Sequence, residues 1–177
     1  MKLRAFLPLA GLLLVAAIPP APVDDVARAK ELLKPMAGMW DSEMTFMGMG
    51  PMKGTEDVKL VSGGLVAMVT AGGDMGPSGT FEGHGMIGFD PKAKVWHHIW
   101  TDNQDPGLVV TVGTWSADGK SFVVEDETDL GMGAGPQLMV MTTTVTGEGT
   151  REFTMKAKDS KPEMPPVMSA KYKRRAN

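Results

Sequence analysis

The chain has 177 residues, a formal net charge of −3 and no cysteine. The acidic balance argues against a nucleic-acid partner, because such a partner requires a basic surface that neutralises phosphates. Without cysteine the chain forms no disulfide, has no thiol nucleophile and lacks the lipid-bearing cysteine of a bacterial lipoprotein. Its length is that of one ordinary domain.

Residues 1–17 have the composition of a secretory signal peptide. Lys2 and Arg4 precede an apolar run that is shorter than the roughly 20 residues a membrane-spanning helix requires. Val15 and Ala17 are small residues that fit the positions before a cleavage site. We therefore predict a signal peptide over 1–17, a single domain over 18–177, and a periplasmic or secreted bacterial protein without a membrane anchor after cleavage.

A short helix is expected over about 24–34, with Asp24 or Asp25 as N-cap and Pro35 ending it. From Trp40 onward, apolar and polar residues alternate with the period of a strand, and glycine and proline recur at the spacing of turns. We predict strands over about 40–47, 52–61, 64–71, 79–88, 94–102, 107–115, 121–129, 137–146, 150–158 and 166–174.

Consecutive strands joined by turns such as those at Asp90-Pro91 and Asp118-Gly119 pair as antiparallel neighbours. An open meander would expose two edges, whereas closure removes them. The predicted fold is therefore all-β, a closed antiparallel barrel of about ten strands with one short N-terminal helix.

Two strand faces are too apolar to lie on the outside of a solitary soluble barrel. They are predicted to point inward and to line a pocket for a small hydrophobic molecule: Trp40, Met44, Phe46, Trp96, His98 and Trp100. His97 points to the opposite face from His98, because adjacent strand residues alternate. His98 would then be a lone polar group in an apolar ligand site.

The 16 methionines raise the alternative of a copper protein, since thioethers are ligands of Cu(I). His84 and Met86, two residues apart on one strand face, are the best pair for such a metal site. We expect methionine to act instead as a flexible filler of the core, and so predict no cofactor. Haem held by one inward histidine is a further alternative.

No catalytic residue is predicted, because the chain has neither a Gly-x-Ser-x-Gly nor a His-Glu-x-x-His motif. Glu125, Glu127 and Asp129 share a strand face that we interpret as solvated, with Asp126 opposite. We expect a binding protein rather than an enzyme. A cavity enzyme of unknown reaction stays open as an alternative, and so does a homo-oligomer.

The run Gly83–Gly88 spells Gly-x-Gly-x-x-Gly, the pattern of a dinucleotide-binding turn. That turn requires a helix directly after it, whereas Phe89-Asp90-Pro91 follows here. We interpret these glycines instead as bends or bulges within a barrel strand.

Four segments resemble the bacterial DUF1579 family of uncharacterised proteins: 33–40 (LKPMAGMW), 54–58 (GTEDV), 85–91 (GMIGFDP) and 169–174 (SAKYKR). The resemblance covers most of residues 32–175 and implies a lipocalin-like (calycin-type) barrel with no assigned activity. In barrels of that type a basic side chain of the last strand covers the first tryptophan, which implies Lys173 or Arg174 on Trp40. The outline is also similar to nitrobindin-type haem-binding barrels, but no haem ligand of that group matches a position here.

Overall fold

The computed structural model describes residues 24–76, 79–130, 133 and 135–176. The predicted signal peptide, 1–17, and part of the glycine-rich segment 131–136 lie outside the described residues. Within the described residues, none of the helices has the length and apolar content needed to cross a membrane.

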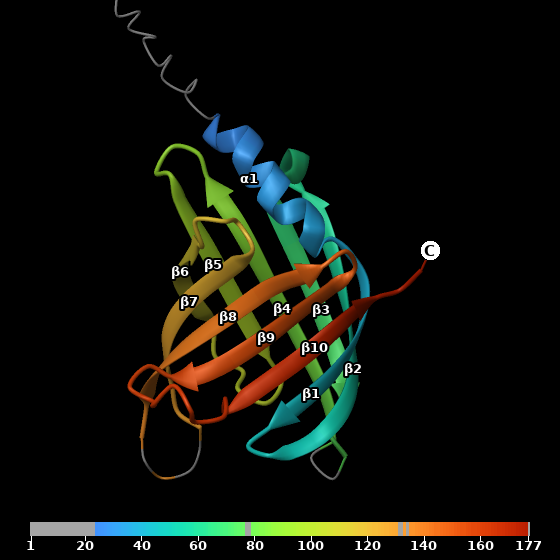
Figure 1. Cartoon of the computed structure of the whole chain (residues 1–177), viewed down its shortest axis with the longest axis vertical. Coiled ribbons are helices and arrows are strands. Elements are labelled where there is room, and N and C mark those ends of the chain that lie inside the picture. Colours follow the sequence, from blue (N-terminus) through green and yellow to red (C-terminus); the bar gives the residue numbers. More distant parts are fainter. Residues whose placement is uncertain (1–23, 77–78, 131–132, 134, 177) are drawn as a thin grey trace, which may run out of the picture.

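Helix α1, Asp25–Leu33, begins where the sequence predicts. Asp24 is the N-cap, because its carboxylate accepts hydrogen bonds from the backbone N–H groups of Val26 (2.9 Å) and Ala27 (3.4 Å). A short 3₁₀ turn, Lys34–Met36, follows. Ala29 and Leu33 are buried and turn toward the strands. Figure 1 shows α1 lying across one end of the barrel, which we call the closed end.

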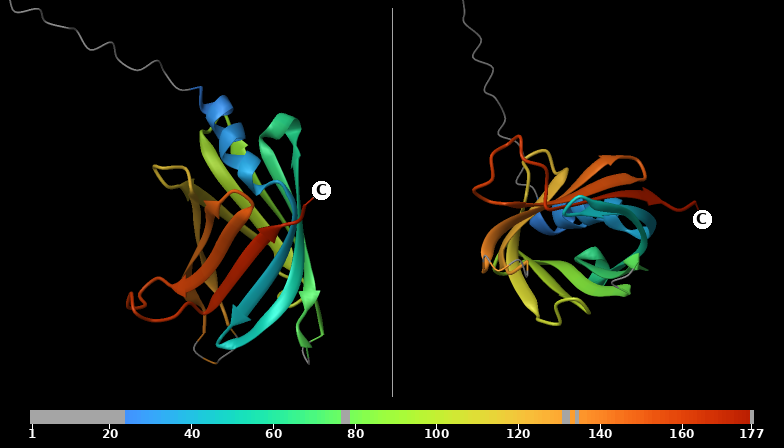
Figure 2. Two further views of the ribbon diagram at one scale, coloured as in Figure 1. Left: turned by 45° about the vertical axis from the view of Figure 1, so that its right-hand side comes forward. Right: turned by 90° about the horizontal axis from the view of Figure 1, so that it is seen from below.

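The prediction of a closed ten-stranded antiparallel barrel is confirmed. Each strand pairs with its neighbours in the sequence, and the last strand pairs with the first (Figure 1). The strands are β1 (Gly38–Phe46), β2 (Met49–Val61), β3 (Val66–Asp74), β4 (Thr80–Asp90), β5 (Val95–Asp102), β6 (Val109–Trp115), β7 (Ser121–Thr128), β8 (Gln137–Gly147), β9 (Thr150–Ala157) and β10 (Met168–Arg174). Figure 2 shows the ring of strands from below, with α1 across its far end.

The hydrophobic core lies under α1. Its members come from the helix and from the inward face of the first strands and of β7: Leu33, Met36, Trp40, Val58, Ala67, Val69, Ile87, Phe122 and Val124. Leu33 and Trp40 are almost completely buried. The helix therefore acts as a plug, because its apolar face completes a core that the strands leave open at this end.

The glycines of β4 form no β-bulge, one of the two roles that we expected for them. The register of β4 against β3 and β5 runs without a shift through Gly83 and Gly85. A Cβ atom on either glycine would lie 2.5 Å from the Trp100 ring. Because Gly83 and Gly85 have no side chain, the Trp100 indole can pack directly against β4 inside the barrel. Gly113 has the same role for Phe122, since a Cβ atom there would lie 2.1 Å from the Phe122 ring.

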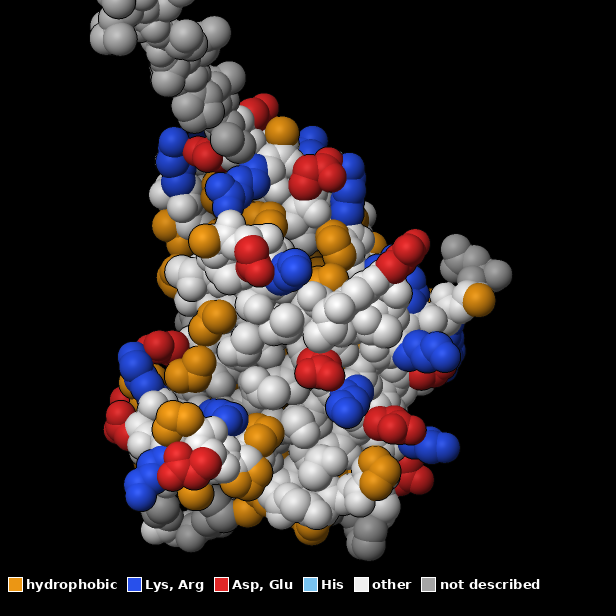
Figure 3. Space-filling view, viewed as in Figure 1, with side chains coloured by type: hydrophobic (Ala, Val, Ile, Leu, Met, Phe, Trp, Pro, Cys, Tyr) orange, Lys and Arg blue, Asp and Glu red, His pale blue; other side chains and the backbone are white. Residues whose placement is uncertain are grey.

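The outer face over α1 and β8–β10 carries acidic and basic side chains side by side, with no large region of one sign (Figure 3). The ion pair between Lys158 and Glu125, 2.5 Å, belongs to this mixture of surface charges.

Candidate functional site

Trp40 is the centre of the closed end. Its side chain is 1% exposed, and its indole N–H donates a hydrogen bond to the Met36 carbonyl, 3.0 Å away. The guanidinium carbon of Arg174 lies 4.6 Å from the centre of the Trp40 ring. The expected cation–π contact is therefore made by Arg174, which also donates to the Pro35 carbonyl at 2.5 Å, and not by the exposed Lys173.

A second arginine packs on the same tryptophan. The guanidinium carbon of Arg151 lies 4.5 Å from the Trp40 ring and 4.3 Å from the Tyr172 ring. Arg151 is 3% exposed and forms a buried ion pair with Glu56. Burial, together with the nearby Glu56 carboxylate, raises the pKa of the Tyr172 hydroxyl. The inward face of the barrel thus carries a compensated charge pair stacked between aromatic rings.

Sequence reasoning missed this pair, although a signal was present. Glu56 has the same strand parity as the buried Val58, and Arg151 has the same parity as Phe153 and Met155. A charged residue at an inward position of each of two strands, with opposite signs, indicates a buried pair.

Trp96 belongs to an aromatic cluster under the closed end. Its ring centre lies 5.1 Å from that of Phe89, 5.8 Å from that of Trp115 and 6.2 Å from that of Phe122. Edge and tilted contacts at these distances are typical of a packed aromatic core. Of the two residues predicted to line a pocket that lie near α1, Trp40 is buried, whereas Trp96 is partly buried and packs against the core.

The other four lie in the half of the barrel away from α1, which we call the lower half. Met44, Phe46, His98 and Trp100 have the inward parity of their strands but are only partly buried. On the opposite wall Met139, Met155 and Ala170 are buried. The lower half is thus packed against β8–β10, while side chains on β1 and β5 keep accessible surface.

Two inward side chains of β5 in the lower half, His98 and Trp100, have polar partners. The His98 Nδ1 atom lies 3.3 Å from the Thr111 hydroxyl, and burial lowers the pKa of His98. The Trp100 N–H donates to a carboxylate oxygen of Asp102 at 2.8 Å. A neutral imidazole next to a hydroxyl can donate or accept a hydrogen bond according to its tautomer. The arrangement can orient a bound molecule through these hydrogen-bonding groups.

The pair proposed for copper lies elsewhere. His84 and Met86 share a face of β4, but it is the outward face, opposite to the buried Gly85 and Ile87. His84 is exposed, and its Nε2 atom lies 3.0 Å from Glu82. The residues that the structure describes hold no group of three or more His, Cys, Asp or Glu side chains that could bind a metal ion.

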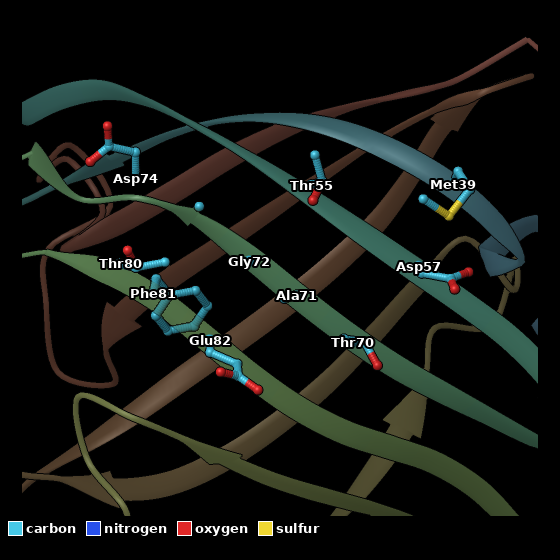
Figure 4. A pocket seen from close by; sticks show the side chains of 11 residues that line it. Met39, Thr55, Asp57, Thr70, Ala71, Gly72, Asp74, Thr80, Phe81 and Glu82 are labelled. Carbon is cyan, nitrogen blue, oxygen red and sulfur yellow. The ribbon is translucent and has the colours of Figure 1, made fainter.

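A shallow depression of about 660 Å³ lies on β1–β4. Thr55, Asp57, Thr70 and Glu82 border it from the outward positions of their strands (Figure 4). It contains none of the six residues predicted to line the pocket.

Residues 26–174 match the family model described as "Protein of unknown function (DUF1579)". The chain belongs to the DUF1579 family. A search of curated proteins found no match. The family resemblance seen in the sequence of this DUF1579 protein is thereby confirmed.

One ladder of the DUF1579 barrel is incomplete. Strand β6 pairs with β7 through only three residue pairs, Gly113–Val124, Thr114–Val123 and Trp115–Phe122. Residues 109–112 continue β6 paired with β5 alone, and residues 125–128 continue β7 paired with β8 alone. We call this gap in the pairing the β6–β7 seam. It lies in the lower half, beside His98 and Thr111.

Proposed function

We propose that this protein binds a small, largely apolar molecule in the lower half of its barrel. The observation that carries the proposal is the partial exposure of Met44, Phe46, His98 and Trp100, whose strand positions point them inward. Leu33 and Trp40 beneath α1 are, by contrast, almost completely buried.

The inward residues beside Met44 on β1–β3 are small. Ser42 pairs with Gly54, and Gly54 pairs with Gly73 across β1, β2 and β3. A Cβ atom on Gly54 would lie 2.8 Å from the Ser42 hydroxyl oxygen, so these strands approach one another closely. Barrels of similar size either fill with side chains or hold one small ligand. Aromatic and methionine walls with a few polar groups have the composition of a small-molecule site.

The site is best tested with a neutral fluorescent probe, N-phenyl-1-naphthylamine, titrated into the full domain. We expect saturable binding with energy transfer from tryptophan. Trp100→Phe should reduce that transfer, and His98→Ala should change the affinity. His97→Ala is the matched control, because His97 is the next residue on the same strand and lies on the exposed outer face. Absence of any binding would contradict the proposal and favour a filled barrel.

We also propose that the protein is exported and that residues 1–17 are removed, because a charged start precedes an apolar run in that segment. N-terminal sequencing of protein from the periplasm and the medium checks this. Recovery of an intact Met1 in the membrane fraction would contradict it.

A further inference from the structure

Asp126 is an inward carboxylate that has no hydrogen-bond or ion-pair partner among the residues the structure describes. It has the strand parity of the buried Phe122 and Val124 and pairs across the ladder with the buried Met139. Its neighbours Glu125 and Glu127 are exposed on the outer face, as the sequence predicts. The Asp126 side chain makes no hydrogen bond or ion pair with any described residue.

No other charge in the lower half compensates it. Among the described residues, the inward positions of the lower strand halves carry no lysine or arginine. Arg151 lies closer to α1 and is paired with Glu56. Asp102 accepts the Trp100 N–H and the backbone N–H groups of Gln104 and Asp105. Asp126 is thus the one inward carboxylate there that lacks a donor, within the part of the chain that the structure describes.

The β6–β7 seam lies next to this carboxylate. Continuing the β6–β7 register past Gly113–Val124 would set Thr111 opposite Asp126, and Thr111 is the partner of His98 in the β5–β6 ladder. His98, Thr111 and Asp126 thus occupy corresponding inward positions on three successive strands. On the outer side of the same seam, Val110 and Val112 are 60% and 59% exposed. The outer side of the seam is therefore apolar, and its inner side is polar.

We propose that Asp126 binds the positively charged nitrogen of an organic amine whose apolar part lies in the lower half of the barrel. This inference rests on the proposed function and adds the chemical class of the ligand. A carboxylate removed in part from water gains most from a cationic donor, because charge-assisted hydrogen bonds are stronger than neutral ones. The aromatic and methionine walls suit the apolar body, and the Trp100 ring suits contact with a cation.

Three ligands that share one alkyl chain separate the head-group effect from apolar binding. Decylamine, decanol and decanoate are each used to displace N-phenyl-1-naphthylamine from the full domain at neutral pH, below the concentrations at which they form micelles. We expect decylammonium to bind about tenfold more tightly than decanol, as one charge-assisted hydrogen bond predicts, and decanoate to bind most weakly.

Asp126→Asn should abolish the preference for the amine while keeping the affinity for decanol. Glu127→Gln is the matched control, because it removes the same charge from the adjacent position on the outer face and should leave the preference unchanged. A preference that survives in Asp126→Asn, or equal affinities for amine and alcohol in the unaltered protein, would overturn the inference. Failure of every ligand and of the probe to bind would instead refute the proposed function, so the two failures are distinguishable. The comparison in the unaltered protein stays decisive even if Asp126→Asn does not fold.

Discussion

Charged and titratable side chains inside this barrel differ in how they are compensated. Glu56 and Arg151 neutralise each other beneath α1, where both are buried. His98 lies in a partly apolar environment with only a hydroxyl beside it. Because burial penalises an unpaired charge far more than a paired one, these residues should respond to substitution and pH in different ways.

Arg151→Met should destabilise the protein by about 3–5 kcal/mol, since it leaves the Glu56 carboxylate buried without a counter-charge. The double variant Glu56→Leu with Arg151→Met should regain much of that loss. Urea unfolding followed by tryptophan fluorescence measures both. Lys94→Met is the control, because it breaks the exposed Lys94–Asp25 ion pair and should hardly move the unfolding midpoint. Equal midpoints for Arg151→Met and Lys94→Met would contradict a structural role of the buried pair.

Burial holds the pKa of His98 below its ordinary value of 6.5. The unfolded chain therefore binds a proton on this residue at pH values where the native protein does not, and stability should fall as the pH drops from 6.5 toward the lowered native pKa. The free energy of unfolding, measured on both sides of that window, should decline less in His98→Gln than in the unaltered protein. His97→Gln, exposed on the opposite face, should retain the full decline. An identical decline in all three proteins would show that His98 does not carry the effect.

At the scale of elements, ladder pairing and side-chain volume are not uniform around the barrel. The ladders among β1–β5 and among β7–β10 each contain six or more residue pairs, whereas β6 and β7 share three pairs near the closed end. Glycine at position 113 brings the Phe122 ring close to β6 at the last of these pairs. Packing therefore holds the upper part of this ladder, and the lower part is left as the seam.

Hydrogen exchange should detect the seam directly. Amides of residues 109–112 and 125–128 that point between β6 and β7 are expected to exchange faster than amides of the same strands that point into the β5–β6 and β7–β8 ladders. Residue-resolved exchange measured by NMR provides the comparison. Uniform protection across both edges would show that the two strands pair along their full length in solution.

Gly113→Val should destabilise the protein by about 1–3 kcal/mol, because a side chain at this position would overlap the Phe122 ring. Thr114→Val, one residue further along the strand and exposed on the outer face, is the size-matched control and should have little effect. Thermal unfolding followed by circular dichroism measures both. A neutral Gly113→Val would mean that the ring moves aside without loss of packing.

At the scale of the whole molecule, the two halves of the barrel differ in their packing. The half under α1 is a core of helix and strand residues that includes Leu33 and Trp40. The other half keeps inward surface accessible on β1 and β5. If the core under α1 supplies most of the stability, side chains of the proposed site in the lower half can rearrange around a ligand without unfolding the barrel.

Leu33→Ala tests this division of roles. Leu33 has no exposed surface, so its truncation should cost about 2–5 kcal/mol of folding free energy. The affinity for N-phenyl-1-naphthylamine should change little under conditions in which the variant is folded, because the proposed site lies in the other half. Lys34→Ala, the exposed next residue, is the control for helix propensity. A large loss of affinity in folded Leu33→Ala would show that the closed end takes part in binding.

The sequence by itself determined the elements and their facing. Alternation from Trp40 onward, and the Gly and Pro residues between strands, predicted ten strands within a few residues of their observed limits, and Asp24 with Pro35 predicted the helix. Both signals are local, because the strand period and the capping chemistry depend on neighbouring residues alone.

Only the tertiary structure decided which inward residues meet. The partners Glu56 and Arg151 stand 95 positions apart and are brought together by the register around the closed barrel. The same register places Trp100 over Gly83 and Gly85, and it ends the β6–β7 ladder above Asp126. The alternation of apolar and polar residues along a strand predicts only that a side chain points inward. How far along the barrel it lies, and which side chain or empty space it faces, depends on how the strands are staggered against one another.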